Sequence, residues 1–359
     1  TVHLFNADEC INFTCDAEKV REMYRALKRF GYNAIRLSFN MVNDDISTVL
    51  RVADEEGILL MMNLRGISGN EYAMWNTPET RTQLENRMAA DIRGWNNHPS
   101  IVMWYLSVNF LGYSLDYHPL KMMDGYLPDS KADKYKVARN GETILRKYDT
   151  TRPFFYQAGG FHGPVINSNA YFCWWPQAER RTWAEEWRKS GTKPLHIIET
   201  SFPYVSSMTG MDRQFHGTSK VKFIHENAAR YLGNDGYDAS QKLVNNYSAG
   251  SRDGKEFFGV TLASYHFRDF ERYTKLKIYL LGNTIRHWRA SGISGICPFG
   301  EFTYGFRRLN YKKRVAPGDF RRNGWHPDIL KSKYQDDADY SKPMPFGLAI
   351  RDAFAPVLV

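Results

Sequence analysis

Short apolar runs alternate with segments of helical periodicity along most of the 359 residues, and this alternation constrains the fold more than any other feature. The runs are apolar on both faces, as expected of parallel strands that are covered by helices. The eight runs cover residues 1–5, 33–39, 58–64, 101–106, 153–157, 169–174, 194–198 and 292–299. We therefore predict a (β/α)8 barrel of the α/β class over residues 1–345.

The segments between the runs carry helix signals. Val20, Met23 and Leu27 fall on one helical face after Asp16, which is a good N-cap residue, and Gly31 ends that helix. Pro78 stands where a helix tolerates proline, in its first turn. Further helices are predicted at residues 46–56, 77–95, 131–148, 178–189, 220–232 and 276–289. The final segment, 346–359, reads as strand-like, and we interpret it as a possible start of a further domain.

In such a barrel the functional residues lie at the C-terminal ends of the strands. Glu199 directly follows the buried run 194–198, and a carboxylate in that position is costly unless it is paired or functional. The other candidates share this placement after a predicted strand, and each could instead serve packing or charge neutralisation. They are Arg36, Arg65, Asn109, Gln157, Tyr171, Trp174, Trp175 and Glu301.

The charge and the apolar runs limit the classes of partner. The net charge is +9, and much of the excess lies between Arg307 and Lys333, a patch that could attract nucleic acid or an anionic glycan. No zinc-finger spacing or RNA-recognition motif accompanies it, so we do not expect a nucleic-acid partner. No apolar run reaches 18 residues, so no membrane span is predicted. We expect no metal or organic cofactor and a secreted or periplasmic location, and the oligomeric state stays open.

Five motifs resemble one enzyme group: "LKRFGYNAIRLSFN", "VLRVADEEGILLM", "WNNHPSIVMWYLSVN", "DTTRPFFYQ" and "KPLHIIETSF". Over about residues 16–300 the chain looks like the catalytic barrel of clan A retaining glycoside hydrolases, nearest to family 2 and the related β-galactosidase and β-mannosidase types. The third motif is the most specific of the five. The resemblance implies a β-glycosidase and a carbohydrate substrate.

The resemblance also implies roles for individual residues. Glu199 would be the nucleophile, Arg36 the arginine that holds it, Asn109 a contact to the sugar 2-hydroxyl, and Tyr171 a hydrogen-bond partner of the nucleophile. From their places at the strand ends, and not from the resemblance, Arg65, Gln157, Trp174 and Trp175 are predicted to bind substrate. The family's acid/base glutamate follows the asparagine, and Phe110 stands in that position. A retaining enzyme needs two carboxyl groups roughly 5–5.5 Å apart, and phenylalanine supplies none.

Several hypotheses accommodate Phe110. The chain can be a working retaining glycosidase whose acid comes from another residue: Asp116, Glu301, His118, Asp8 or Glu9. It can be a glycosidase-derived protein that hydrolyses poorly and mainly binds glycan through Trp174 and Trp175. Phe110 can also be an introduced change. A structural or protein-interaction barrel, which belongs to a different class, would lack a convergent site at the strand ends. The basic segment adds an anionic glycan to the candidate ligands.

Overall fold

The computed structural model describes residues 4–7, 16–37, 46–64, 75, 77–107, 110, 125, 127, 129–170, 177–200, 270–298, 306–308, 338–343 and 345–356. Within these residues eight parallel strands form one sheet in the order β5-β4-β3-β2-β1-β8-β7-β6. The strands are β1 (Leu4–Ala7), β2 (Ala34–Leu37), β3 (Leu59–Asn63), β4 (Ile101–Tyr105), β5 (Phe154–Phe155), β6 (Ile166–Asn169), β7 (Leu195–Thr200) and β8 (Gly295–Pro298).

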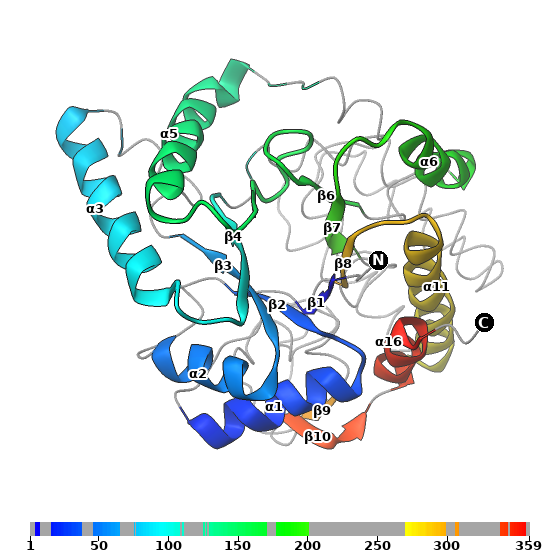
Figure 1. Ribbon diagram of the computed structural model, residues 1–359. Helices are drawn as coiled ribbons and strands as arrows, with labels where there is room; N and C mark the ends of the chain where they lie inside the picture. The colour runs from blue at the N-terminus through cyan, green and yellow to red at the C-terminus, as the bar shows by residue number, and fades with distance from the viewer. Residues whose placement is uncertain are drawn as a thin grey trace, which may run out of the picture.

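The two ends of this strand order, β5 and β6, meet through the segment that follows β5. The backbone N–H of Gly160 donates to the carbonyl of Asn167 at 2.8 Å, and the N–H of Asn167 donates to the carbonyl of Gly160 at 3.2 Å. The strands lie in the middle of the molecule with the helices around them (Figure 1). The (β/α)8 barrel expected from the alternation is confirmed.

The helices of the outer layer follow the strands in chain order. They are α1 (Ala17–Arg29), α2 (Ile46–Glu56), α3 (Pro78–Trp95), α5 (Ala132–Tyr148), α6 (Gln177–Ser190), α11 (Phe270–Ala290) and α16 (Pro345–Phe354). A short 3-10 turn, η4 (Asp129–Lys131), precedes α5, and a separate antiparallel pair, β9 (Phe306–Arg308) and β10 (Ala338–Pro343), lies beside α1 (Figure 1). The helix predicted at residues 220–232 lies outside the described residues. No helix in the described part of the chain is long and apolar enough to cross a membrane.

Two helix starts follow the capping signals in the sequence. The Asp16 carboxylate accepts hydrogen bonds from the backbone N–H groups of Glu18 and Lys19, at 3.0 and 3.3 Å. Thr77 caps α3, with Pro78 in the first turn. Side-chain caps satisfy N–H groups that have no partner inside the helix, so both helix starts were predictable from local sequence.

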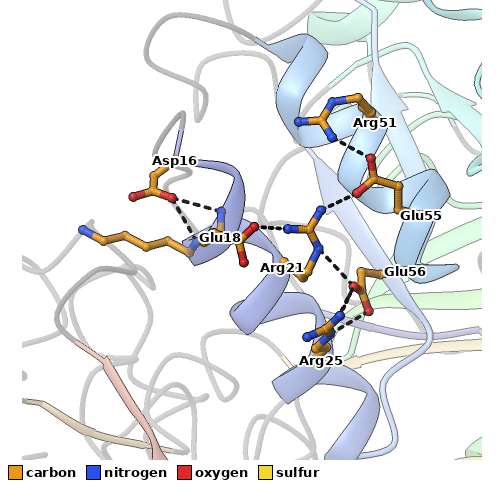
Figure 2. A network of polar contacts seen from close by, with 8 residues as sticks. Asp16, Glu18, Arg21, Arg25, Arg51, Glu55 and Glu56 are labelled. Carbon is orange, nitrogen blue, oxygen red and sulfur yellow. Dashed lines mark hydrogen bonds and ion pairs between the residues drawn. The ribbon is translucent and has the colours of Figure 1, made fainter.

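Ion pairs join α1 to α2 on the surface of the barrel. Arg21 of α1 contacts Glu18 on its own helix and Glu55 on α2, and its Nε atom lies 3.3 Å from Glu56 (Figure 2). Arg25 lies 2.9 Å from the same Glu56 carboxylate. An isolated exposed pair contributes little to stability, but a network shares the cost of ordering its side chains. These contacts therefore set how the two helices are placed side by side.

The barrel has two hydrophobic layers, because successive side chains of a strand point to opposite faces. The inner cluster contains strand residues and their flanks only: Ala34, Met61, Met103, Tyr105, Phe155, Val165 and Ile198. The larger cluster joins the outer faces of the strands to the helices, and it contains Leu60, Trp104 and Phe154 together with residues of α1, α2, α3 and α5. The face of each strand residue can be read from the cluster to which it belongs.

Two elements differ from their sequence-based predictions. The sixth strand is Ile166–Asn169, whereas the apolar run predicted it at 169–174. The four buried residues of this strand are mostly polar, so apolar content does not indicate it. The end of the chain was predicted as a strand, and that prediction is wrong for Pro345–Phe354, which is helical. Ile350, Ala353 and Phe354 are buried at the spacing of a helix. Whether a further domain follows stays a prediction.

Helix α16 packs against the barrel beside α11. The Phe354 ring stacks on Phe5 of β1 with 4.5 Å between ring centroids, and Tyr32 meets it edge-on at 5.0 Å. Arg289 of α11 donates to the carbonyl of Ala355 at 2.9 Å, just past the end of α16. This helix therefore covers the outer side of β1 and takes the place of the last barrel helix.

Candidate active site

A β-bulge turns Glu199 toward the barrel interior. Ser168 of β6 pairs with Ile197 of β7, and the next residue, Asn169, pairs with Glu199. Two residues of β7 thus face one of β6, and Ile198 is the extra residue. Ile198 already belongs to the inner cluster, so regular alternation would point Glu199 outward. The bulge changes this and directs both side chains inward, a common use of bulges next to functional sites.

Glu199 is buried between a cation and an amide that come from two other strands. Its Oε1 atom accepts a hydrogen bond from Gln157 Nε2 at 2.8 Å and lies 3.5 Å from Arg36 Nη2. The side chains of Glu199 and Arg36 are 8% and 0% exposed. A neighbouring cation and a hydrogen-bond donor both favour the ionised form of a carboxyl group. The arrangement therefore holds a carboxylate at the C-terminal end of β7.

Gln157 reaches Glu199 because it is two residues beyond Phe155 and so has the same inward orientation. Its backbone N–H donates to the carbonyl of Ser107 at 3.2 Å, and its own carbonyl accepts from the N–H of Phe110 at 2.8 Å. The ends of the fourth and fifth strands are joined at this point. Three residues predicted from sequence, Arg36, Gln157 and Glu199, are thus brought together at one end of the barrel.

The Phe110 ring is fully buried and packs toward the helices. It stacks on Tyr156, with 5.1 Å between ring centroids, and lies 6.1 Å from the rings of Tyr135 and His162. Phe110 and Tyr156 both belong to the outer cluster, whereas Gln157 faces the interior. The backbone of Phe110 is therefore next to the site, while its ring lies on the opposite face of the strand end. Its assignment to the acid/base position stays a prediction.

His196 fills the barrel interior below Glu199. Its ring meets Phe155 edge-on at 5.9 Å, and burial, together with the nearby Arg36 charge, lowers its pKa to about 3. A Cβ atom placed on Gly295 of β8 would come within 2.4 Å of this ring. The glycine therefore makes room for the histidine, which stays neutral at ordinary pH and donates or accepts without adding charge.

Sequence reasoning missed several buried polar residues at the same end of the barrel: Asn63, Ser107, Asn167 and Asn169. Asn63 Nδ2 donates to the Tyr105 carbonyl at 3.3 Å, and Asn169 is in register with Glu199. Counting in steps of two from an inward apolar residue finds the first two, since Asn63 follows Met61 and Ser107 follows Tyr105. The asparagines of β6 could not be found in this way, because the strand itself was misplaced.

The remaining candidates lie outside the described residues, and their roles stay predictions. They are Arg65, Asn109, Asp116, Tyr171, Trp174, Trp175 and Glu301, together with the alternative acids Asp8, Glu9 and His118. No group of metal-binding side chains is found among the residues that the structure describes. A cavity of about 380 Å³ between α3 and α5 is lined by Trp75, Arg81, Asp133, Lys136, Val137 and Asn140, and it does not include the residues around Glu199.

The chain is similar to solved structures at low identity. A β-galacturonidase from Eisenbergiella tayi is 18% identical with a TM-score of 0.41, and covers 66% of this chain and 42% of its own. A β-D-mannosidase from Dictyoglomus thermophilum is 14% identical with a TM-score of 0.46, and the match covers 83% of this chain and 35% of the mannosidase. A β-glucuronidase from Bacteroides uniformis is 17% identical with a TM-score of 0.42, and the match covers 66% of this chain and 29% of the glucuronidase. The chain spans less than half the length of each of these proteins. No curated protein sequence matches it.

A family model gives a match that covers more than half of the chain. Residues 13–228 match the TIM barrel domain of the glycosyl hydrolases family 2. That range contains the strands β2 to β7 and the cluster of Arg36, Gln157 and Glu199. The chain therefore belongs to glycosyl hydrolase family 2 and carries its TIM barrel domain.

Proposed function

We propose that the protein cleaves a β-glycosidic bond of an oligo- or polysaccharide with retention of configuration, and that Glu199 is the nucleophile. The observation that carries this proposal is the buried Glu199 carboxylate between Arg36 and Gln157 at the C-terminal end of the barrel. Active sites of this fold lie at that end. A buried carboxylate held ionised by two partners suits nucleophilic attack better than it suits packing.

The proposed reaction has two steps. The Glu199 carboxylate attacks the anomeric carbon, the bond to the leaving oxygen breaks, and a glycosyl–enzyme ester forms. Water then attacks the same carbon, the ester bond to Glu199 breaks, and the water gives up one proton to a base or to the solvent. The carboxylate is regenerated and the sugar leaves in its original configuration. Arg36 and Gln157 keep the carboxylate ionised and oriented before the attack. After the attack they stabilise the carboxylate again as it leaves.

The leaving oxygen needs a proton in the first step, and Phe110 has none to give. We infer that either Asp116 or Glu301 supplies the acid, or that natural linkages react slowly because no acid is present. General acid–base help contributes roughly 10²–10⁴-fold to a rate. Activated aryl glycosides need little of this help, because their leaving groups depart as anions.

The proposed ligand is a carbohydrate that can be anionic. The segment from Arg307 to Lys333 contains nine lysines and arginines and two aspartates. A local positive charge of this size attracts anionic ligands over several ångströms. We therefore include acidic and sulfated sugars among the proposed substrates, and we propose a secreted or periplasmic site of action, where such glycans are met.

Replacement of the nucleophile tests the function. We expect the wild-type chain to turn over at least one aryl β-glycoside with an activated leaving group, and Glu199→Gln to reduce this rate to background. Glu85→Gln is the matched control, because Glu85 lies on α3 and pairs with Lys147 on the outer surface at 2.8 Å. Release of the aryl group is measured by absorbance. Turnover that survives Glu199→Gln would contradict the proposal.

A second function, glycan binding with little hydrolysis, is favoured by one observation: Phe110, which the family resemblance assigns to the acid/base position, is a buried aromatic ring. In that case the wild type binds sugars in a calorimetric titration and turns over no aryl glycoside. Slow turnover of natural linkages beside fast turnover of aryl glycosides, by roughly 10²–10⁴-fold, would instead show a working nucleophile without an acid.

A further inference from the structure

The turn that follows β5 has a strained backbone next to the site. Ala158 adopts φ +52°, and it is the one non-glycine residue with positive φ in the described part of the chain. L-residues disfavour this conformation, and it persists only when neighbouring contacts impose it. Gly159 is required beside it, since a Cβ atom there would lie 2.6 Å from Tyr156 Cβ. A contact from another part of the barrel must therefore impose this conformation next to the candidate nucleophile.

That contact comes from Asn167 of β6. Its Oδ1 atom accepts a hydrogen bond from the backbone N–H of Ala158 at 2.8 Å, and its backbone pairs in both directions with Gly160. Asn167 is fully buried, and its Nδ2 atom has no hydrogen-bond partner among the described residues. The side-chain oxygen of Asn167 therefore holds the turn by accepting the Ala158 N–H.

The peptide unit held by Asn167 is the one that follows Gln157. Its N–H belongs to Ala158 and bonds to Asn167, and its carbonyl belongs to Gln157 and accepts from the N–H of Phe110 at 2.8 Å. With both ends of this peptide fixed, the direction of the Gln157 side chain is fixed too. That side chain donates to Glu199 at 2.8 Å. A chain of contacts therefore runs from Asn167 to the proposed nucleophile.

We propose that Asn167 is a positioning residue, which sets the Gln157–Glu199 hydrogen bond by holding the left-handed turn at Ala158. Its kinetic consequences rest on the proposed function, whereas its effect on the ionisation of Glu199 does not. Asn167 acts on the reaction through Gln157 and needs no contact with the sugar. The proposal gives β6 a part in the site that its polar, buried sequence did not reveal.

The variant Asn167→Ala tests this proposal together with Gln157→Leu, which removes the donor itself. We expect both variants to raise the pH at which Glu199 ionises, by about one unit, the size of a lost charge-assisted hydrogen bond. The double variant should shift it no further than Gln157→Leu alone, because both changes remove the same contact. Infrared difference spectra between each protein and its Glu199→Gln version, recorded across a pH titration, measure this ionisation without turnover.

The matched control is Asn33→Ala. Asn33 Oδ1 also accepts a backbone N–H from a strand, that of Phe5, at 2.8 Å, but at the N-terminal end of β2. This control should cost stability and leave the ionisation of Glu199 unchanged. If Asn167→Ala fails to fold, Asn167→Ser keeps a polar side chain too short to reach Ala158, and the same shift is expected. An unchanged Glu199 in the folded variant, or additive shifts in the double variant, would overturn the proposal.

Kinetics supply a second readout on activated aryl glycosides. Asn167→Ala should lower kcat about tenfold with a smaller change in KM, and move the acid limb of the pH–rate profile upward. A purely structural residue would lower the amount of folded enzyme and leave the profile in place. If the wild type shows no turnover, the proposed function fails, and the infrared titration still decides the role of Asn167.

Discussion

At the scale of single residues, the site depends on which way each side chain faces. Ile198 is the extra residue of a bulge, and because of it the carboxylate of Glu199 meets Arg36 and Gln157 inside the barrel. Phe110 has its backbone beside the same site and its ring among the outer aromatic residues. Residues one or two positions apart in sequence therefore have different environments and different chemistry.

His196 makes a testable contribution to acid sensitivity. Burial and the Arg36 charge lower its pKa from 6.5 to about 3, so between these values the unfolded chain binds a proton that the folded chain excludes. The contribution of the neutral His196 to stability is fully present above about pH 6.5 and is lost as the pH falls toward 3. We expect the free energy of unfolding in urea to fall by several kcal/mol from about pH 7 to about pH 4, and His196→Gln to flatten this slope.

Asp149→Asn is the control for this pH dependence. Burial opposes ionisation of Asp149, but hydrogen bonds from Trp104 and Arg152 outweigh it and lower the pKa of this carboxyl below its ordinary value of 3.8. Its contribution is present above that value and is lost only at lower pH. The control should keep the slope between about pH 7 and about pH 4. A slope in His196→Gln equal to that of the wild type would refute the assignment.

At the scale of elements, the close approach of β7 and β8 depends on a missing side chain. Gly295 has ordinary backbone angles, yet a Cβ atom there would lie 2.4–2.8 Å from three atoms of the His196 ring. The His196 ring is buried against the backbone of β8, so a side chain at Gly295 would displace the ring or separate the two strands. Glycine is therefore required at this position for space and not for conformational freedom.

Gly295→Ala should lower the free energy of unfolding by about 1–3 kcal/mol, the usual cost of an extra methyl group in a packed core. Gly94→Ala is the matched control, since Gly94 lies in α3 with nothing within 4 Å of the added Cβ atom. It should raise stability by about 0.5–1 kcal/mol, because alanine favours the helix. Urea denaturation measures both. Equal changes in the free energy of unfolding for the two substitutions would show that the His196 ring moves aside at little cost.

At the scale of the whole molecule, the barrel is held together by contacts between the two ends of the described chain. The Phe354 ring of α16 stacks on Phe5 of β1, and the guanidinium of Arg289 on α11 lies over the Phe5 ring, 5.2 Å from its centroid. A Cβ atom on Gly31 would come within 2.7 Å of Phe354 Cβ. Helix α16 thus joins the first strand and the helix before the last strand in one packing unit.

Removal of the Phe354 ring tests this role of α16. Phe354→Ala should lower the free energy of unfolding by about 3–5 kcal/mol, since it empties a buried site lined by aromatic rings. Tyr279→Ala on α11 is the control, because that side chain is 49% exposed and its loss should change stability by less than about 0.5 kcal/mol. Thermal and urea unfolding give both values. A cost below about 1 kcal/mol for Phe354→Ala would mean that α16 docks by other contacts.

Much of the fold follows from local signals. Helix periodicity, the caps at Asp16 and Thr77 and the apolar runs depend on residues close in sequence, so the order of strands and helices was predictable. Strand β6 was not predicted at its place because its residues are mostly polar, and α16 was predicted as a strand because its sequence contains a short apolar run. Within the site, Glu199 was predictable because a carboxylate after a buried apolar run requires an explanation, and the family motif supplied one.

By itself the sequence determined the class of fold, the helix ends and the position of a buried carboxylate, because spacing along the chain decides these. Only the tertiary structure decided that a bulge turns Glu199 inward, that the Phe110 ring turns outward, and that Asn167 supports the turn beside Gln157. These three features depend on register and contact between strands distant in sequence. The spacing of residues along the chain does not indicate such contacts, because they form only when the barrel closes.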